Sequence, residues 1–388
     1  MALINQTNSS TFSNFFNSEK SSGILLIICT LLSLIVTNSV FGTSYLAFWQ
    51  TYVAGLTIEH WVNDGSMAIF FLLIGLELER EFYVGELSNF KNALLPIFAA
   101  IGGLTLPAFI HFTLNEGSAT QAGIGIPMAT DIAFTLGVLA LLGNRIPTSL
   151  KVLLTAIAVM DDFGAIVVIA VFYTSNLNIL YLIGALAVFG LLILFNRMKV
   201  MSLLPYIIGG VFMWFLMFKS GIHATIAGVL LAFAIPFTHK VGDVKSPSHK
   251  LEHCLHKPVA FIILPIFAFV NTGVVIGSDW FQSLSSTNSM GILLGLILGK
   301  PFGITLASLL VVSIGICRLP SDINWKHMIG IGILGGIGFT MSIFITNLAF
   351  VGEAHIINSS KMAILLASLI AGVIGFVWLR LTTKDKSK

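Results

Sequence analysis

Long apolar runs dominate this sequence, and they constrain its fold more than any other feature. A bilayer-spanning helix needs about 20 consecutive, mostly apolar residues, and the sequence holds twelve such stretches separated by short polar connections. The predicted spans are residues 22–41, 60–78, 93–114, 120–142, 149–173, 177–196, 203–218, 221–237, 258–278, 289–316, 326–350 and 359–381. Only 10% of the residues are charged, against about 25% in a typical soluble domain. The chain is therefore predicted to be an all-α integral membrane protein.

Basic residues are distributed unevenly over the connections, and this predicts the orientation of the chain. Lys and Arg concentrate on the cytoplasmic side of membrane proteins. If the N-terminus is cytoplasmic, 17 of the 20 basic residues lie on that side, Lys219 and Lys361 lie opposite, and Lys300 lies inside a span. We therefore expect twelve transmembrane helices with both the N- and the C-terminus in the cytoplasm.

The chain is expected to form a single transmembrane domain over residues 1–388. Residues 1–20 are polar and lack the basic start and the cleavage site of a signal peptide, so they are predicted to be a cytoplasmic N-terminal segment. Residues 382–388 are predicted to be a basic cytoplasmic tail. The net charge of +3 then belongs to a cytoplasmic membrane face, so the expected large partner is the lipid bilayer and no nucleic acid is expected.

Four charged residues lie deep inside the predicted spans: Asp131, Asp161, Asp162 and Lys300. An Asp or Lys at the centre of a spanning helix costs about 2.5–3.5 kcal/mol, so a chain that only crossed the bilayer would not carry them. One Asp–Lys pair could be a structural salt bridge, but three acids and one base leave negative charge in excess. Ionisable groups within membranes mark pathways for ions or protons, and the excess sign predicts that the transported species is a cation.

The adjacent carboxylates in AVMDDFGAI (158–166) are predicted to have different roles. Consecutive helical residues point about 100° apart, so Asp161 and Asp162 cannot serve one ligand equally. One is expected to bind the cation and the other to pair with Lys300, and this geometry leaves open which is which. Carboxylate oxygens suit a small hard cation. Protons compete for the same atoms, so the pair could exchange one for the other.

Two predicted spans are interrupted by Gly and Pro, in GIGIPMATDIAF (123–134) and GILGGIGFTMS (332–342). Close helix packing through small residues is one explanation. However, these are spans 4 and 11, the middle members of the oppositely oriented groups 3–5 and 10–12, and interruptions at corresponding places of inverted-topology repeats indicate a transporter's binding site. If the two interrupted helices cross, Asp131 would offset the positive half-helix ends, with Thr130 as a cap or ligand, and Lys300 would offset the negative ends.

Seven motifs carry a resemblance to a known family. They are PMATDIAFTLGVLALLGNRIP (127–147), AVMDDFGAIVVIAVFYT (158–174), GIHATIAGV (221–229), LEHCLH (251–256), LPIFAFVNTGV (264–274), GLILGKPFGI (295–304) and GGIGFTMSIFI (335–345). Together they resemble the NhaA-type bacterial sodium/proton antiporters, from about residue 20 to about residue 380. The inverted-repeat fold of that family is already known, so the resemblance implies the fold as well.

The resemblance implies an electrogenic exchanger that expels one Na⁺ or Li⁺ for two incoming protons and becomes active at alkaline pH. It implies a single multi-pass transporter domain in a bacterial inner membrane, with Na⁺, Li⁺ and H⁺ as substrates and no cofactor. Asp162 matches the principal cation carboxylate, and Asp161 matches the carboxylate that pairs with Lys300 and also takes part in binding. Thr130 and Asp131 match the pair at the broken helix.

The resemblance also implies a pH-sensing region and a dimer. The pH-sensing residues would be Glu77, Arg80 and Glu81 in GLELEREF, Glu252, His253 and His256 in LEHCLH, and His223 in GIHAT. Glu79 departs from the family, because a basic residue is common at this position in relatives. Residues 42–59 alternate enough to form a hairpin, and in the family such a hairpin supports a homodimer.

Other classes fit less well. An intramembrane aspartyl protease would need a Tyr-Asp pair and a Gly-x-Gly-Asp turn, which the sequence lacks. DFG (162–164) has no accompanying His-Arg-Asp loop, and GLILGKP (295–301) lacks the Ser or Thr of a P-loop, so the chain is predicted not to be an enzyme. A sodium-coupled symporter of the same fold is the nearest alternative. A cation channel is another, although channels use pore loops or charged rings across subunits.

Overall fold

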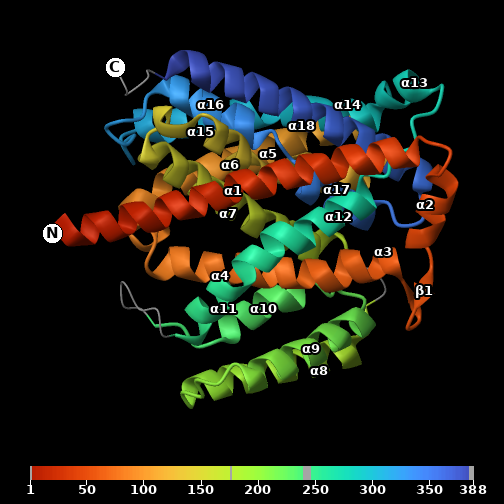
Figure 1. Cartoon of the computed structure of the whole chain (residues 1–388), viewed down its shortest axis with the longest axis horizontal. Helices are drawn as coiled ribbons and strands as arrows, with labels where there is room; N and C mark the ends of the chain where they lie inside the picture. The colour runs from red at the N-terminus through yellow and green to blue at the C-terminus, as the bar shows by residue number, and fades with distance from the viewer. Residues whose placement is uncertain (1, 175–176, 239–245, 384–388) are drawn as a thin grey trace. The chain divides into compact units, whose positions relative to one another are not determined.

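The computed structural model describes residues 2–174, 177–238 and 246–383, and it is almost entirely helical (Figure 1). The elements of the first part are α1 (Ala2–Thr37), α2 (Gly42–Trp49), β1 (Tyr52–Val53), β2 (Leu56–Thr57), α3 (Ile58–His60), the π-helix η1 (Trp61–Ser66), α4 (Met67–Tyr83), the 3₁₀-helix η2 (Glu86–Ser88), α5 (Phe90–Asn115), the 3₁₀-helix η3 (Ala119–Met128), α6 (Ile132–Leu141), the 3₁₀-helix η4 (Gly143–Arg145) and α7 (Thr148–Phe172). The elements of the second part are α8 (Ile179–Arg197), α9 (Leu204–Ser220), α10 (Ile226–Ala234), α11 (Pro247–Pro258), the π-helix η5 (Val259–Ile263), α12 (Leu264–Asn271), α13 (Trp280–Leu284), α14 (Thr287–Leu294), the π-helix η6 (Gly295–Gly299), α15 (Lys300–Ser313), α16 (Trp325–Gly335), α17 (Phe339–Ala349) and α18 (Ala354–Thr382). Most of the predicted basic tail, residues 384–388, lies outside the described residues.

Among the described residues, 8 helical runs are long and apolar enough to cross a bilayer, or up to 10 if each bent helix pair counts as one span. The runs are Lys20–Thr37, Ile58–Tyr83, Phe90–Asn115, Thr148–Phe172, Ile179–Arg197, Pro247–Asn271, Thr287–Ser313 and Ala354–Thr382, and the bent pairs are Ala119–Met128 with Ile132–Leu141 and Trp325–Gly335 with Phe339–Ala349. The prediction of an all-α membrane protein is confirmed. The predicted spans 203–218 and 221–237 correspond to the shorter helices α9 and α10, so twelve spans and their repeat symmetry stay predictions.

Two helices extend beyond their predicted ends, and this changes which charges are buried. Helix α4 continues to Tyr83, past the predicted end at residue 78, so Glu79 lies inside it and is 5% exposed. Helix α18 begins at Ala354, before the predicted start at residue 359, so Lys361 lies further from the helix end than predicted and is 8% exposed. The four deep charges singled out from the sequence are therefore not the only buried ones.

The predicted span at 258–278 begins and ends earlier in the structure, as the run Pro247–Asn271. Ser246 explains the early start, because its side chain accepts a hydrogen bond from the backbone N–H of His249 and caps α11. Hydropathy alone missed this polar first turn, since the apolar residues begin only after it.

Residues 42–59 form the predicted hairpin only in part. Helix α2 occupies the first portion, and the hairpin is limited to the antiparallel pairs Tyr52–Thr57 and Val53–Leu56. Its strands β1 and β2 are two residues long each. The expected dimer contact would therefore have to use a very short strand edge.

Two compact units make up the chain. Unit 1 comprises Met1–Ile35, Leu94–Asp161 and Val274–Lys388, and unit 2 comprises Val36–Ala93 and Asp162–Gly273. In unit 1, α18 packs along α14, α16 and α17, and α15 packs along α16 (Figure 1). In unit 2, α10 packs against α4 and α9, and α8 packs against α9. The helix–helix contacts within each unit hold the polar side chains described below.

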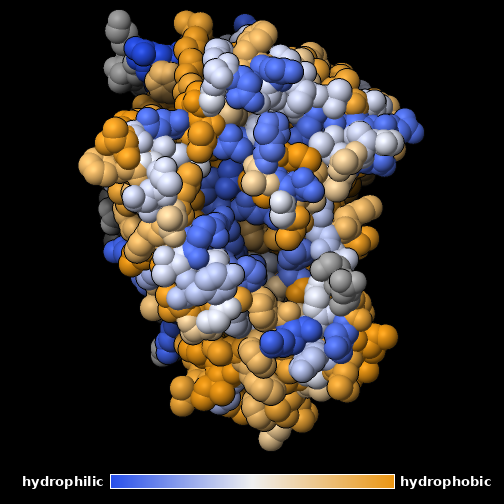
Figure 2. All heavy atoms as spheres, turned by 90° about the vertical axis from the view of Figure 1, so that its right-hand side faces the viewer, coloured by the Kyte–Doolittle hydropathy of each residue, from blue (hydrophilic) through white to orange (hydrophobic). Residues whose placement is uncertain are grey.

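Large apolar side chains cover much of the exposed surface. Figure 2 shows large patches of hydrophobic side chains alongside hydrophilic ones on the face that it presents. Val171, Phe172 and Leu180 are each about two-thirds exposed or more. A water-soluble monomer rarely exposes large contiguous apolar areas, whereas lipid-facing helices do, so the surface agrees with an integral membrane protein.

Candidate functional site

The two interrupted helices meet at their breaks. The axis bends by 42° between η3 and α6 and by 43° between α16 and α17. At the meeting point the backbone N–H of Asp131 donates to the carbonyl of Ile337 at 2.7 Å, and Ser342 Oγ donates to the carbonyl of Ile126 at 2.6 Å. Backbone groups freed by the breaks are thus satisfied by the other broken helix, as a membrane interior requires.

Asp131 caps the first turns of both half-helices that begin at the breaks. Its Oδ1 accepts from the backbone N–H of Phe134 in α6 at 2.9 Å. Its Oδ2 accepts from the backbone N–H of Thr340 in α17 at 3.0 Å and from the Thr340 hydroxyl at 2.5 Å. Helix N-termini carry partial positive charge, so one carboxylate, 2% exposed, faces two positive ends at once.

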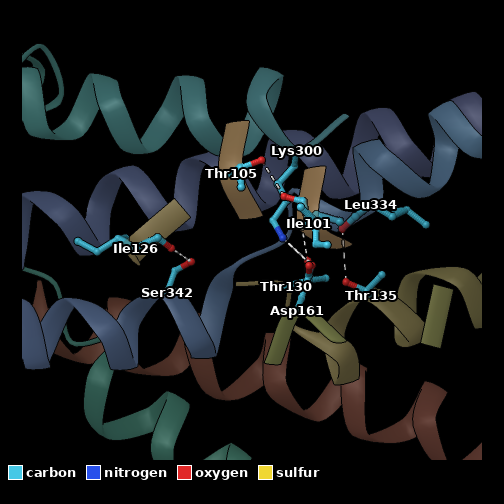
Figure 3. A network of polar contacts seen from close by, with 10 residues as sticks. Ile101, Thr105, Ile126, Thr130, Thr135, Asp161, Lys300, Leu334 and Ser342 are labelled. Atoms are coloured by element: carbon cyan, nitrogen blue, oxygen red, sulfur yellow. Dashed lines mark hydrogen bonds and ion pairs between the residues drawn. The ribbon is translucent and has the colours of Figure 1, made fainter. Parts of the chain in front are cut away.

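Lys300 and Asp161 form a fully buried ion pair beside the breaks (Figure 3). Lys300 Nζ lies 2.6 Å from Asp161 Oδ2 and 3.0 Å from Thr130 Oγ1, and both charged side chains are 0% exposed. Thr130 Oγ1 lies 2.6 Å from Asp161 Oδ2 and 2.9 Å from the carbonyl oxygen of Gly335, the last residue of α16. Four polar groups therefore meet at one point: the Lys300 ammonium, the Thr130 hydroxyl, the Asp161 carboxylate and the C-terminal carbonyl of α16.

The local structure of the chain explains how Lys300 reaches this point. It follows directly on the π-helix η6, and π turns inside α-helices recur at functional sites because they redirect the side chains that follow. Helices α5 and α15 also approach backbone to backbone here. A Cβ on Gly102 would lie 2.2 Å from the Gly303 carbonyl oxygen, and a Cβ on Gly303 would lie 2.2 Å from that of Gly102. Any larger residue would push the lysine-bearing helix away.

The carboxylates of α7 offer oxygen ligands for a cation. Asp161 Oδ1 accepts no hydrogen bond from the described residues, although it is buried. Asp162, the next residue on α7, is 1% exposed. In the part of the chain that the structure describes, no three His, Cys, Asp or Glu side chains come together as a metal-binding group. A cation at Asp161 would therefore complete its shell with hydroxyl and carbonyl oxygens, such as those of Thr130 and Gly335.

Comparison with known proteins decides the family. A family model described as Na⁺/H⁺ antiporter 1 matches residues 13–379. The chain belongs to this antiporter family. Proteins named Na(+)/H(+) antiporter NhaA are similar to it in Dechloromonas aromatica (70% identity over 96% of both chains), Flavobacterium psychrophilum (59%, over 96% of this chain and 97% of the relative) and Cytophaga hutchinsonii (58%, over 96% of both). The resemblance inferred from the motifs is thereby confirmed, and sodium/proton antiport is the activity of this family.

Unit 2 of this antiporter-family chain holds all seven residues expected to sense pH. Arg80 forms an ion pair with Glu252, and its Nη2 lies 3.4 Å from Glu81 Oε1. Glu77 lies one turn before Arg80 on the same helix and is half-buried. His253 is exposed and His256 is half-buried on α11. The structure thus joins the end of α4 to α11 through Arg80.

His223 lies apart from the Arg80 ion pairs. It sits in the connection between α9 and α10, where its Nε2 is 2.8 Å from the carbonyl oxygen of Tyr173. The charged side chain whose field reaches it is Asp64. At 1.5 Å per helical residue, Asp64 and Arg80 are separated by about 24 Å along the η1–α4 run. The expected pH-responsive residues therefore occupy two separate places in unit 2.

Some polar contacts were not anticipated from the sequence. Thr340 donates a hydrogen bond to Asp131, and Ser342 donates one to the η3 half-helix. In the sequence, both residues belong to the glycine-rich interruption at 332–342, and no separate role was predicted for them. Hydroxyl residues directly after such an interruption are a usable signal, since freed backbone and capping groups need partners. Glu79 Oε2 accepts from Ser248 Oγ at 3.2 Å, so this buried acid has a hydrogen-bond donor on another helix.

Proposed function

We propose that the chain is an electrogenic antiporter that exchanges cytoplasmic Na⁺ or Li⁺ for external protons, with about two protons entering per cation. Family membership supports sodium/proton exchange. The observation that carries the site assignment is the buried Lys300–Asp161 pair with Thr130, at the meeting point of the two broken helices. A buried charge pair has a high desolvation penalty, so a membrane protein is expected to keep it where charge must be exchanged.

The proposed cycle uses the two carboxylates of α7. In the inward-facing state, deprotonated Asp162 and Asp161 bind the cation, with Thr130 as a further oxygen ligand. Lys300 then leaves Asp161 or loses its proton. After the change to the outward-facing state, protons displace the cation. Two charges entering against one leaving move one net charge, so the membrane potential contributes about 2.3 kcal/mol per 100 mV.

Asp131 has a different role in this proposal. It stays charged and compensates the positive ends of α6 and α17, a role supported by its three hydrogen-bond donors at their first turns. Lys300 compensates the opposite, negative ends, and Thr130 links it to the C-terminal carbonyl of α16. The helix breaks therefore remain electrostatically balanced while the cation and the protons change places.

The proposal extends to topology, assembly and regulation. The chain forms one transporter domain of twelve spans, with inverted repeats 3–5 and 10–12, in a bacterial inner membrane with both termini in the cytoplasm. Two copies associate as a homodimer through the hairpin. The transported cations and protons are substrates, and the cycle uses no cofactor. Activation at alkaline pH arises at Glu77, Arg80, Glu81, His223, Glu252, His253 and His256, and its support is the network of ion pairs around Arg80.

Reconstituted liposomes test this proposal. Na⁺ efflux, proton influx and membrane voltage are followed together while the pH is raised from acid to alkaline. The proposal predicts coupled counter-movement of Na⁺ and H⁺, net charge transfer and activity only at alkaline pH. Na⁺ flux that needs no counter-moving proton would instead support a sodium-coupled symporter or a cation channel.

A further inference from the structure

An apolar groove in unit 1 lies beside the first turns of α6 and α17. Its volume is about 380 Å³, and it is lined by α1, α6, α13, α17 and α18 and by residues just before α13. Helix α1 touches α6 where a Cβ on Gly23 would lie 3.1 Å from Gly137 Cα. Further along α1, between Ile27 and Leu34, side chains line the groove instead. The groove thus begins beyond the place where α1 and α6 touch, and α13, α17 and α18 complete its walls.

The walls of the groove suit a hydrocarbon and no polar ligand. No charged side chain lines it, and the hydroxyls that do are Thr30 and Ser368. Thr30 Oγ1 donates to the carbonyl of Leu26 at 2.8 Å, and Ser368 Oγ accepts from the backbone N–H of Phe339 at 3.2 Å. Because both hydroxyls are already engaged, an ion or a hydrated ligand would lose more solvation than the groove returns.

The groove follows part of two long helices. Its wall uses residues 27–34 of α1 and residues 362–369 of α18, about 12 Å of each helix, in the portions toward α13 (Figure 1). Trp280, which also lines the groove, lies on α13 in a connection between spans, where indole rings mark the headgroup level. Phe134 and Phe339 line it from the first turns after the helix breaks. Half of a hydrocarbon core of about 30 Å is about 15 Å, the depth that one leaflet's acyl chains fill.

We propose that this groove binds one acyl chain of a membrane phospholipid from the leaflet on the α13 side. The chain enters at Trp280, and its methyl end rests against the rings of Phe134 and Phe339, whose centroids are 5.4 Å apart. The backbone N–H of Phe134 is held by Asp131, and that of Phe339 is held by Ser368. The bound chain therefore supports the first turns of both half-helices. This inference stands independently of the proposed transport cycle.

Photo-crosslinking of the full chain tests the site. The protein is reconstituted in phosphatidylethanolamine and phosphatidylglycerol liposomes with a trace of phosphatidylglycerol that carries a diazirine near the methyl end of one acyl chain. Labelled peptides are then mapped by mass spectrometry. We expect labelling of residues 132–141 and 339–349, because Phe339 is 2% exposed and the groove gives a chain access to it. Labelling confined to the exposed faces of α1 and α18 would overturn the proposal.

Two variants and one competition experiment sharpen the test. Leu366→Trp fills the groove and is expected to reduce labelling of the two peptides several-fold. Leu306→Trp, an exposed leucine on α15 outside the groove, should leave it unchanged. Excess unlabelled phosphatidylglycerol should reduce labelling of the unaltered chain, a measurement that requires no variant. Equal labelling in both variants, no competition, or stronger labelling by a diazirine-bearing free fatty acid would each contradict a phospholipid site.

Discussion

Two ion pairs in this molecule join residues that are far apart in the sequence, and they differ mainly in their access to water. Lys300 and Asp161 in unit 1 are both 0% exposed. Arg80 in unit 2 keeps 41% of its side chain exposed while it pairs with Glu252, which keeps 8%. The same pairing chemistry thus occurs in one fully desolvated place and in one that water still reaches.

Because the two ion pairs differ in hydration, they suit different tasks. Removing one partner of a buried pair leaves a charge with no solvent to stabilise it, so an ion or proton must replace the missing partner. Occupancy of the site by a cation or proton is thereby coupled to its charge, as ion exchange requires. Breaking a partly hydrated pair costs less free energy, because water screens the charges, and such a pair suits the adjustment of activity with pH. The predictions below test this contrast, from the largest expected effect to the smallest.

Lys300→Ala is expected to have the largest effect on stability. It leaves Asp161 buried beside Thr130 without its cation, so the free energy of unfolding should fall by about 3–5 kcal/mol. Thermal unfolding in detergent measures this loss, and voltage recordings should show an altered charge stoichiometry. Lys219→Ala, which removes an exposed lysine, serves as the control. An unchanged melting temperature for Lys300→Ala would remove the buried pair from the account.

Asp131→Ala is expected to have the next largest effect, because it removes the acceptor for the first turns of both α6 and α17. The loss should be about 2 kcal/mol, since a single N-cap contributes about 0.5–2 kcal/mol. Asp131→Asn keeps an acceptor oxygen but loses the charge. Its melting temperature should therefore lie between that of the unaltered chain and that of Asp131→Ala. If Asn and Ala were equally destabilising, the charge would matter and the cap would not.

Arg80→Gln should change stability by only about 0–1 kcal/mol, because the pair is partly hydrated. Its effect should appear in the pH profile of exchange instead. Loss of the guanidinium favours protonated carboxyl groups nearby, so the activity midpoint should move to higher pH. Arg318→Gln, at an exposed arginine, is the control. A large loss of stability with an unmoved midpoint would reverse the roles assigned to the two regions.

Glu79→Gln should have the smallest effect. The neutral amide can still accept from Ser248 and no longer buries a charge, so the free energy of unfolding should stay the same or rise slightly. Chemical or thermal unfolding at alkaline pH gives the comparison with Arg80→Gln. If Glu79→Gln lost more free energy of unfolding than Arg80→Gln, burial alone would not determine how much each charge in unit 2 affects stability.

The sequence predicted the ion-pair site better than it predicted the elements around it. The buried charges, the interrupted helices and an acid–base pair with Lys300 could be proposed because each is expensive in an apolar span, whereas the assignment of Asp161 to that pair came from the family resemblance. The end of α4, the start of α18 and the Ser246 cap could not, because hydropathy does not register polar first and last turns. The hydrogen bond from Thr340 to Asp131 could not be predicted, because the two residues lie on different broken helices.

Exchange by an Asp162→Asn variant tests the central claim most directly. The variant, the unaltered chain and an Asp279→Asn control at an exposed acid are reconstituted in liposomes, and Na⁺-dependent proton movement is recorded at alkaline pH. Thermal unfolding of each protein checks that it is folded. The account predicts that Asp162→Asn folds but carries no exchange, whereas Asp279→Asn remains fully active. Full exchange by Asp162→Asn would contradict the assignment of the α7 carboxylates as the cation site.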